Sequence, residues 1–310
     1  MKSPKIIVFG YDELLLAALE FFAQTKTRVE AVVFPSNRTD RRAAEIRRLV
    51  KEKNFATLEQ PPRAATSEFA EILRRLEPDL FFVWSYPMIL PAKILEIPKN
   101  GALNLHLGLL PEYRGVNGVR WALINGESAT GVTLHLMDAG VDTGPIVTRV
   151  AYPIAPEDDY RTLLIKSRAA GLHLLKHVWP QIAAGRIGAT PQDETKARYY
   201  SAAMDPGEWI DWSQPNVAIH NLIRASVLPL GGVSAFWEDR RLIVRRSAPV
   251  DGDDPGERPG TIAKIDERGV EVVTGRGRLL LTAIEIDGRL VSPAELSAMG
   301  LKAGNYLQND

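Results

Sequence analysis

Short apolar runs alternate with helix-like periodicity through the first third of the chain. A continuous apolar run closed by a glycine, as at residues 5–9 before Gly10, is typical of a strand buried on both faces. Apolar residues spaced by three and four predict helices between the runs. The expected strands are 5–9, 28–34, 80–84 and 102–105, and the expected helices are 12–25, 40–53 and 67–76. This alternation predicts an α/β fold with a doubly wound, mostly parallel, Rossmann-like sheet.

The pattern changes in the second half. Residues 159–184 have apolar positions at helical spacing, and Pro180 is expected to kink or end that helix. Residues 185–206 have the composition of a linker. From residue 233 onward, short β-type runs separated by turn residues predict a small, OB-like β-barrel. The expected organisation is a catalytic domain at 1–184, a linker at 185–206 and a barrel domain at 207–310.

Charge and composition exclude several kinds of site. Lys and Arg total 38, Asp and Glu also total 38, and there is no cysteine. Disulfides, thiolate catalysis and zinc–thiolate sites are therefore impossible. A surface that binds nucleic acid usually brings a positive excess, so a neutral chain makes one less expected. His173 and His177 stand four apart, but no carboxylate completes a zinc-protease motif with them, and no metal is expected.

No targeting or membrane segment is expected. The apolar run at residues 6–9 is too short for a signal peptide, and Asp12 and Glu13 interrupt the next apolar residues. No stretch approaches the ~20 apolar residues that a membrane helix needs. The sequence therefore predicts a cytoplasmic protein without a membrane partner.

Polar residues lie where the predicted sheet should hold its site. Ligands bind beyond the carboxyl ends of parallel strands, and Asn104 and His106, two apart on one strand end, point the same way. The first strand is not followed by GxGxxG, so an ordinary dinucleotide site is excluded. An Asn amide can donate to an oxyanion, a His can move a proton, and Asp142 can orient the imidazole. Together they suit acyl transfer to an amine. The alternatives are that Asn104 caps a turn, that His106 is a buried structural histidine and that Asp142 belongs to a plain turn.

A longer motif surrounds these residues. Between residues 101 and 147 it comprises Asn104-Leu105-His106, Leu109-Leu110-Pro111-Glu112-Tyr113-Arg114-Gly115, Gly126-Glu127, Thr130-Gly131-Val132-Thr133-Leu134-His135 and Asp142-Thr143-Gly144. This series resembles the signature of the folate-dependent formyltransferases. The resemblance continues through residues 209–212 and 223–225, and so covers nearly the whole chain.

The resemblance implies a catalytic trio of Asn104, His106 and Asp142. It also implies a formyl donor, 10-formyltetrahydrofolate, held mainly on backbone groups of two loops. The implied donor contacts are Tyr86, Met88, Ile89, Leu90, Asp138, Ala139, Gly140 and Val141, and the implied acceptor contacts are Tyr11, Arg114 and Asn117. Ordinary packing into the core is the alternative for the apolar residues at 88–90. The chain departs from the family at Gly108, often a Ser, and at residues 116–119, which border the acceptor pocket.

Two branches of the family have two domains and differ in the amine that they formylate. Residues 207–310 hold 12 Lys and Arg against 15 Asp and Glu, a net charge of −3, which suits phosphates poorly. Residues 36–53 hold seven Lys and Arg against three Asp and Glu, a net charge of +4. This segment, however, is predicted to form an amphipathic helix, and the charged face of such a helix is usually only solvated. Residues 9–13 also resemble the branch that formylates amino-sugar nucleotides more than the branch that formylates methionyl-tRNA. We therefore expect a small-molecule acceptor, an amino-sugar nucleotide, and a possible homodimer. The alternative is methionyl-tRNA, and a non-catalytic folate- or nucleotide-binding module is less expected.

Overall fold

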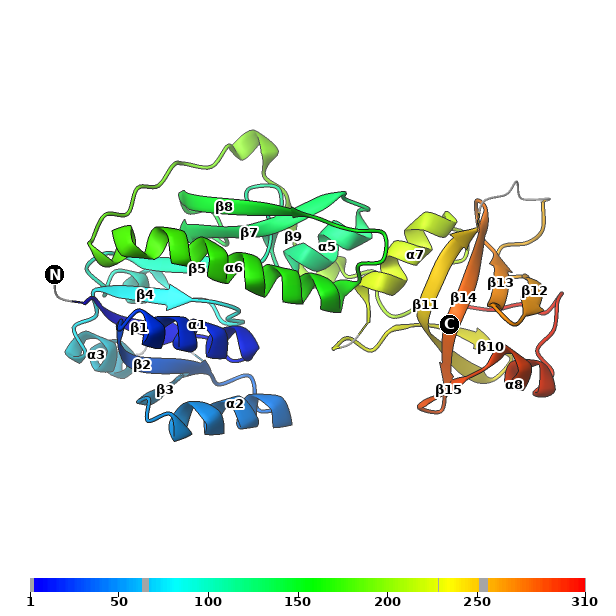
Figure 1. The fold of residues 1–310 in the computed structure, drawn as a ribbon, viewed down its shortest axis with the longest axis horizontal. Coiled ribbons are helices and arrows are strands. Elements are labelled where there is room, and N and C mark those ends of the chain that lie inside the picture. The colour runs from blue at the N-terminus through cyan, green and yellow to red at the C-terminus, as the bar shows by residue number, and fades with distance from the viewer. Residues whose placement is uncertain (1–2, 63–66, 228, 251–255, 310) are drawn as a thin grey trace. The chain divides into compact units, whose positions relative to one another are not determined.

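Two compact units make up the chain. The computed structural model describes residues 3–62, 67–227, 229–250 and 256–309 (Figure 1). The first unit comprises Met1–Gly118, Thr130–Tyr152 and Ile165–Tyr200. The second comprises Val119–Ala129, Pro153–Leu164 and Ser201–Asp310. Residues 185–200 of the expected linker thus group with the first unit.

A seven-stranded sheet forms the centre of the first unit, in the order β3-β2-β1-β4-β5-β7-β8. The strands from β3 to β5 in that order pair parallel, and β7 pairs antiparallel with β5. A separate two-stranded sheet pairs β6 with β9 in parallel. The strands are β1 (Lys5–Phe9), β2 (Arg28–Pro35), β3 (Thr57–Gln60), β4 (Leu80–Val83), β5 (Ala102–His106), β6 (Arg114–Gly115), β7 (Ala129–Leu136), β8 (Ile146–Pro153) and β9 (Tyr199–Tyr200). The predicted mostly parallel, Rossmann-like α/β sheet is confirmed, and the structure adds the antiparallel strand β7.

Helices cover both faces of this sheet, and strand alternation sorts the core between them. Ile6 and Val8 pack in a cluster with α1 (Glu13–Gln24), α2 (Arg41–Glu52) and α6 (Tyr160–Ala183). Ile7 and Phe9, which point the other way, pack in a cluster with α3 (Ser67–Arg75) and α4 (Ala92–Leu95). The strands are therefore buried on both sides, as their continuous apolar runs predict.

Aspartates fix where two of these helices begin. The carboxylate of Asp12 accepts a hydrogen bond from the Leu14 amide at 2.9 Å, and that of Asp40 accepts from the Arg42 and Ala43 amides at 3.0 Å. Such N-caps satisfy amide groups that the first helical turn leaves without partners. The helices therefore start next to the positions that the sequence indicates.

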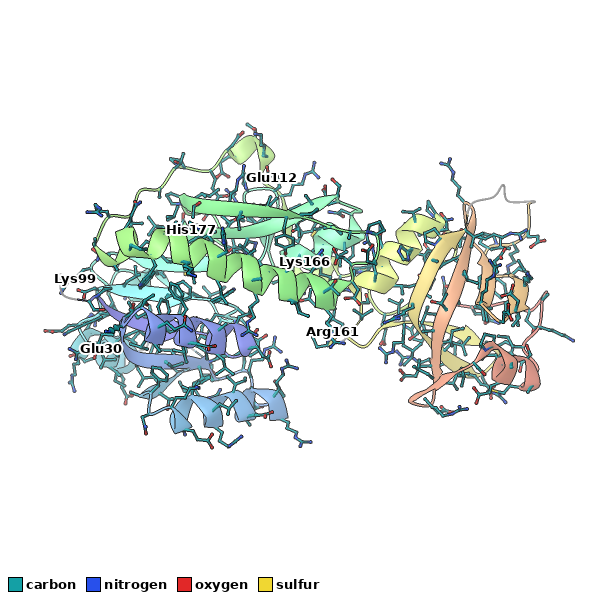
Figure 2. All side chains as sticks on the ribbon, viewed as in Figure 1. Glu30, Lys99, Glu112, Arg161, Lys166 and His177 are labelled. Carbon is teal, nitrogen blue, oxygen red and sulfur yellow. The ribbon has the colours of Figure 1, made fainter. Side chains whose placement is uncertain are left out.

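Two elements differ from expectation. The sequence pattern does not predict the edge strand β3, because its four residues include Glu59 and Gln60 and lack an apolar run. The helix α6 does not end at Pro180 but continues to Ala183. Pro180 is exposed and lies in the last turn, where few backbone bonds remain to be lost. His177, one turn before it, also lies on the exposed side of α6 (Figure 2).

The second unit is built on a separate antiparallel sheet in the order β10-β11-β14-β13-β12, with β15 paired to β14. Its largest apolar cluster fills the inside of this sheet. The elements are β10 (Val233–Trp237), β11 (Arg240–Val250), β12 (Ile262–Asp266), β13 (Gly269–Val273), β14 (Arg278–Ile286), β15 (Arg289–Val291), the helices α7 (Asn216–Ala225) and α8 (Pro293–Ala298), and the 3₁₀ turn η2 (Ala202–Met204). Two further elements are α5 (Gly118–Ile124) and, in the first unit, the 3₁₀ turn η1 (Glu194–Lys196).

The last residues of the chain close this sheet into a barrel. The Phe236 and Gln308 main chains exchange two hydrogen bonds of 2.8 Å, so the segment pairs with β10. On its other side, the Leu307 amide donates to the Gly260 carbonyl at 2.8 Å, next to β12. Residues 305–308 therefore join the two edges of the sheet, and residues 208–210, which pair with Ser234, cover another part of the β10 edge.

We predict that Leu307→Ala lowers the free energy of unfolding of the second unit by about 2–5 kcal/mol, because it empties a fully buried position on the closing segment. Urea unfolding followed by tryptophan fluorescence measures the change. Gln308→Ala is the matched control, because its exposed side chain leaves the backbone pairing intact. Equal effects of the two changes would contradict a packing role for Leu307.

Candidate active site

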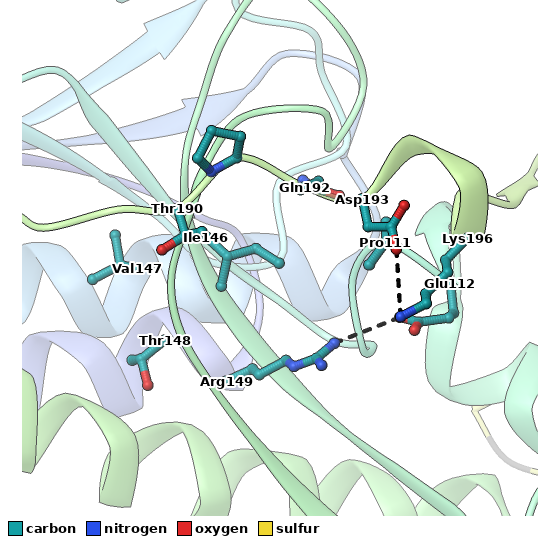
Figure 3. Close-up of a pocket in the computed structure, with 11 residues that line it drawn as sticks. Pro111, Glu112, Ile146, Val147, Thr148, Arg149, Thr190, Gln192, Asp193 and Lys196 are labelled. Atoms are coloured by element: carbon teal, nitrogen blue, oxygen red, sulfur yellow. Dashed lines mark ion pairs between the residues drawn. The ribbon is translucent and has the colours of Figure 1, made fainter.

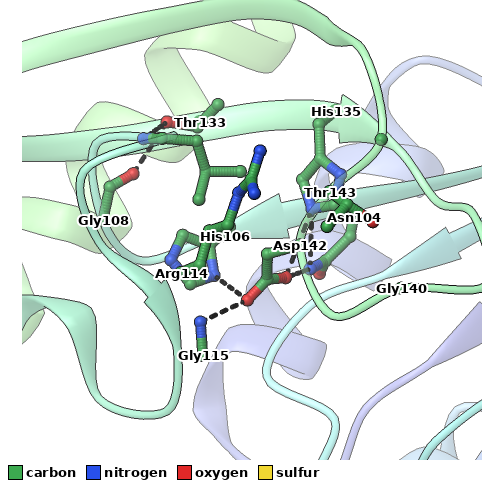
Figure 4. Close-up of polar contacts among 12 residues, drawn as sticks. Asn104, His106, Gly108, Arg114, Gly115, Thr133, His135, Gly140, Asp142 and Thr143 are labelled. Carbon is green, nitrogen blue, oxygen red and sulfur yellow. Dashed lines mark hydrogen bonds and ion pairs between the residues drawn. The ribbon is translucent and has the colours of Figure 1, made fainter. Parts of the chain in front are cut away.

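Two neighbouring strands place three polar side chains at one end of the sheet. On β5, Ala102 packs on the face covered by α3 and α4, so Asn104 and His106 point to that same face. The antiparallel strand β7 sets His135 directly opposite Asn104 and Thr133 opposite His106. Residues directly opposite on antiparallel strands share a face, so His135 joins the pair (Figure 4).

Asp142 comes from the loop between β7 and β8 and lies among these side chains. Its Oδ2 is 3.5 Å from His106 Nδ1 and accepts a 2.8 Å hydrogen bond from the Gly115 amide. Its Oδ1 is 3.4 Å from Asn104 Nδ2 and 3.5 Å from His135 Nε2. The carboxylate is only 11% exposed. The structure thus brings together the three residues predicted as catalytic, around one buried carboxylate.

Two glycines allow this close arrangement. A Cβ on Gly144 would lie 1.8 Å from the Leu136 carbonyl oxygen, so no side chain fits where the loop returns to the sheet. Gly115 has a φ of +95°, and a Cβ there would lie 2.1 Å from the Tyr200 carbonyl oxygen. Both positions need glycine, because their backbones approach other backbone groups too closely for any other residue.

His135 is a residue of the site that the sequence-based candidates lacked. The Leu136 carbonyl accepts its Nδ1–H at 2.8 Å, which leaves Nε2 to accept from Asn104 Nδ2 at 3.2 Å. The amide of Asn104 is therefore oriented with its nitrogen toward the histidine and Asp142. The signal in the sequence is the alternation Thr133–His135, which places both side chains on one face once β7 is known to pair with β5.

The charge of Asp142 is set by its neighbours. Burial by itself raises the pKa of this carboxyl, but His106 and the Gly115 amide outweigh burial and hold the pKa well below its usual range. Asp142 is therefore ionised at neutral pH. His106 Nε2 lies 2.7 Å from the Tyr113 carbonyl oxygen, so the second nitrogen also faces an acceptor. A proton taken up by His106 would be held between these two oxygens.

The residues predicted to bind the donor differ in how accessible they are. Ile89 and Val141 expose 75% and 50% of their surface, while Leu90 is buried in the α3/α4 cluster. Tyr86 donates from its hydroxyl to Gln60 Oε1 at 2.9 Å, and the Ile89 carbonyl accepts from the Gln60 amide at 3.1 Å. Among the other predicted donor contacts, Met88 is partly buried, whereas Asp138, Ala139 and Gly140 are exposed.

The residues predicted to bind the acceptor differ in their burial and in their contacts. Arg114 is fully buried, and its guanidinium bonds to Gln192, Glu194 and Tyr199 inside the protein. Asn117 is exposed and has a φ of 58°. Tyr11 is half-buried under the Arg38 guanidinium, 5.1 Å from its ring centre, and burial and Asp12 raise the pKa of its phenol. The structure does not bring Arg114 to the open side of the trio.

A cavity of about 430 Å³ lies beside β8 and the segment that contains η1 (Figure 3). Its charged side chains are paired with one another: Arg149 with Glu112 at 3.6 Å and Lys196 with Asp193 at 3.4 Å. The trio does not line this cavity, which is bounded by Pro111, Glu112, Ile146, Val147, Thr148, Arg149, Thr190, Pro191, Gln192, Asp193 and Lys196.

Within the described residues, no group of three or more His, Asp or Glu side chains is arranged to hold a metal ion. The rings of His173 and His177 pack with their centres 4.3 Å apart and their planes tilted by 48°, and His177 Nδ1 lies 2.8 Å from the His173 carbonyl oxygen. In the same part of the chain, every helix is too short or too polar to span a bilayer.

Comparison with known proteins assigns both units. The model of the family "Formyl transferase" matches residues 5–178, and that of "Formyl transferase, C-terminal domain" matches residues 206–301. This chain belongs to the formyl transferase family. The prediction of a folate-dependent formyltransferase, an enzyme, is confirmed by this membership.

Relatives and solved structures add detail. The chain is similar to the methionyl-tRNA formyltransferase of Trichlorobacter lovleyi, at 34% identity over 93% of this chain and 91% of the relative. It is also similar to that of Thermosynechococcus vestitus, at 35% identity over 92% and 91%. An N-formyltransferase of Helicobacter canadensis, in complex with folinic acid and dTDP-3-aminofucose, matches with a TM-score of 0.69 over 90% of this chain and 99% of that chain. Its identity is 20%, so it shows the fold alone.

The expectation of an amino-sugar nucleotide as acceptor is wrong. Relatives 29–35% identical over 92–99% of this chain are named methionyl-tRNA formyltransferase. The expectation relied on the net charge of each segment and on the likeness of residues 9–13 to the family members that formylate amino sugars. Net charge does not record where cations lie on a surface, and a few local phosphate contacts need no overall excess.

We predict that Asp142→Asn lowers the free energy of unfolding at neutral pH, with a gap from wild type that is constant above about pH 5 and narrows below about pH 4. The sign follows from the lowered pKa of Asp142 in the folded state. As the pH falls below the ordinary Asp value, the unfolded chain takes up the proton first, and the wild type loses stability that the variant never had. Urea unfolding between pH 3.5 and 8 measures the gap. Asp138→Asn, on the exposed part of the same loop, is the control variant.

Proposed function

We propose that this chain transfers the formyl group of 10-formyltetrahydrofolate to the α-amino group of methionyl-tRNA. The observation that carries the acceptor is the similarity over nearly the full length, across both units, to relatives named methionyl-tRNA formyltransferase. An aminoacyl-tRNA acceptor places the reaction in the cytoplasm, where translation occurs. The folate supplies a formyl group activated on nitrogen; the steps below concern the residues of this chain.

In this proposal, Asn104 stabilises negative charge. As an amine adds to the formyl carbon, the oxygen of that group gains charge and needs a donor. The amide nitrogen of Asn104 has two N–H groups, and one is held only weakly, 3.4 Å from Asp142 Oδ1. That group can turn to the oxyanion while the bond to His135 keeps the amide in place.

His106 and Asp142 move and hold the proton. The attacking amine loses a proton as it adds, and the imidazole of His106 is the base of the trio once its Nε2 exchanges the Tyr113 carbonyl for the amine. The ionised Asp142 stabilises the imidazolium that forms, 3.5 Å from its Nδ1. His106 then returns the proton to the departing folate nitrogen. The proton thus never leaves a buried site, because His106 is only 8% exposed.

The donor loops fit a flat, partly apolar ligand. Ile89 and Val141 present exposed apolar side chains on the two segments assigned to the folate. Asp138 ties its own loop together by accepting from the Gly140 amide at 3.1 Å. The loops therefore offer apolar contact and main-chain polar groups, the combination that small-molecule sites use.

We predict that Asn104→Ala lowers kcat by about 10²–10³-fold and leaves the KM for the donor nearly unchanged, because the amide acts on charge that develops only in the transition state. His106→Ala should remove most turnover with similar donor affinity. Steady-state kinetics and equilibrium binding of the folate measure both. A loss confined to KM would make Asn104 a binding residue instead.

Basic side chains of α2 are the proposed contact to tRNA phosphates in the first unit. Arg41, Arg42 and Arg48 are exposed, and Arg42 and Arg48 pair only with the exposed or partly exposed carboxylates of Glu13 and Glu52. Such surface ion pairs are weak and are readily exchanged for phosphate. Arg47 differs, because it donates to the Pro35 carbonyl at 2.7 Å and so supports the fold.

The acceptor is tested by competition and by salt. Wild type should formylate methionyl-initiator tRNA and not a panel of amino-sugar nucleotides, with an acceptor KM that rises steeply between 50 and 200 mM salt. Changing Arg41, Arg42 and Arg48 together to Ala should raise that KM and reduce the salt slope by about one for every phosphate that these arginines neutralise.

A matched triple change, Arg74, Arg75 and Lys99 to Ala, removes the same charge from other exposed positions and should leave the tRNA kinetics unchanged. Formylation of an amino sugar but not of methionyl-tRNA would overturn the proposed acceptor. Equal effects of the two triple variants would remove α2 as the contact surface.

A further inference from the structure

The main chain around Asp142 is held by one side chain from a distant segment. Gln192 Nε2 donates to the Asp142 carbonyl oxygen at 2.8 Å and to the Gly144 carbonyl oxygen at 2.7 Å. These two acceptors flank a turn in which Asp142 adopts a φ of 55°, a conformation that side-chain-bearing residues rarely hold. Gln192 therefore fixes the backbone conformation that aims the Asp142 carboxylate.

The other end of the same amide is fixed by Arg114. Gln192 Oε1 accepts from Arg114 Nε at 3.1 Å and from Arg114 Nη2 at 2.9 Å. Carbonyl oxygens only accept and a guanidinium only donates, so both ends of the amide require the same orientation. The amide uses both of its N–H groups and both acceptor positions. A carboxylate at this position could accept from Arg114 but could not donate to the two carbonyl oxygens, and an apolar side chain could do neither.

Arg114 is itself a rigid anchor. Its remaining N–H groups go to Glu194 Oε1 at 2.6 Å, Glu194 Oε2 at 2.8 Å and the Tyr199 hydroxyl at 2.8 Å, so all five are satisfied in a fully buried side chain. The bidentate pair also lowers the pKa of Glu194 and keeps its charge opposite the guanidinium.

The strand that carries Arg114 also contacts the carboxylate directly. Gly115, the next residue, donates its amide to Asp142 Oδ2 at 2.8 Å. Asp142 is thus tied to β6 twice: through its carboxylate to the Gly115 amide, and through its main chain to Gln192 and Arg114. One direct bond from the strand and one link through Gln192 thus hold the carboxylate and the main chain of the same residue.

We propose that Gln192 is a positioning residue for formyl transfer, which sets the Asp142 carboxylate against His106 through the main chain of residues 142–144 without touching either substrate. The inference rests on the proposed role of Asp142. It gives Arg114 a role different from the acceptor contact that the sequence suggests: Arg114 anchors the amide of Gln192.

Two variants and one control test the proposal. Gln192→Met keeps the length of the side chain but removes every hydrogen bond. Gln192→Glu keeps acceptors for Arg114 and so protects folding, but sets a carboxylate oxygen against two carbonyl oxygens. Asp193→Ala is the matched control, because Asp193 accepts from the Thr195 amide at 3.1 Å and pairs with Lys196, on the outer side of the same segment.

The kinetic readout separates positioning from stability. Both Gln192 variants should lower kcat by about 10- to 100-fold, the range typical of residues that orient a catalytic group, with the acceptor KM within about twofold of wild type. Asp193→Ala should lower the melting temperature and leave kcat unchanged. Wild-type kcat in Gln192→Glu would overturn the proposal.

A second readout does not depend on the acceptor. Labelling with ¹³C-arginine and ¹⁵N-glycine selects the three Arg-Gly pairs of the chain, at Gly115, Gly269 and Gly277. The Gly115 amide signal reports the charge of Asp142 between pH 3.5 and 5.5. The ionisable side chains that face Asp142 are His106 from β5 and His135 from β7. Asp138 lies on the same loop, and Gly269 and Gly277 serve as internal references.

In wild type and Asp193→Ala the Gly115 signal should be flat, because the pKa of Asp142 is held well below its usual range. In Gln192→Met it should show an inflection within that range, because the loosened loop lets the pKa rise. A flat signal there overturns the proposal. If wild type fails to use methionyl-tRNA, the acceptor is wrong, and the Gly115 signal still decides the role of Gln192.

Discussion

A buried negative charge organises the catalytic end of this protein. An ionised carboxylate loses most of its solvation when it is buried, and only several well-placed donors or cations can offset that loss. Asp142 has Gly115, His106, Asn104 and His135 around it, each from a segment that the fold must bring to the same point. The requirement therefore reaches beyond the site: β5, β6, β7 and the loop before β8 are all placed relative to one charge.

The turn from parallel to antiparallel pairing makes this convergence possible. A purely parallel sheet would present strand ends side by side, with only loop residues to complete the site. Here β7 runs back along β5, so His135 stands opposite Asn104 in register rather than at a strand end. The loop that follows β7 then returns across the same corner and delivers Asp142. One reversed strand thus supplies both a ring nitrogen and the carboxylate.

Much of this could be predicted from the sequence, for physical reasons that also set the limit. Continuous apolar runs predict buried strands such as residues 5–9. The position of Asn104 and His106 at a strand end indicates that they belong to a site. Strand β3 has too few apolar residues for such a signal. Gln192 could not be found either, because its partners are two backbone carbonyls and an arginine that only the tertiary fold brings to it. The charge of α2 is visible in the sequence, but which of its arginines support the fold is not: Arg47 is bound to Pro35 and Arg48 is not.

The closure of the barrel by residues 305–308 has a consequence for how the chain is made. Synthesis proceeds from the N-terminus, and domains generally begin to fold as they emerge. Every strand of the second sheet is complete by residue 291, and residues 208–210 pair with Ser234 on the outer edge of β10. Phe236 and the start of β12, however, gain their outer main-chain partners only when residues 305–308 are released. A released chain that lacks this segment would therefore present two partly unpaired strand edges, the feature that most readily pairs with another chain. For this fold, the closing segment therefore protects strand edges that could otherwise pair with another chain.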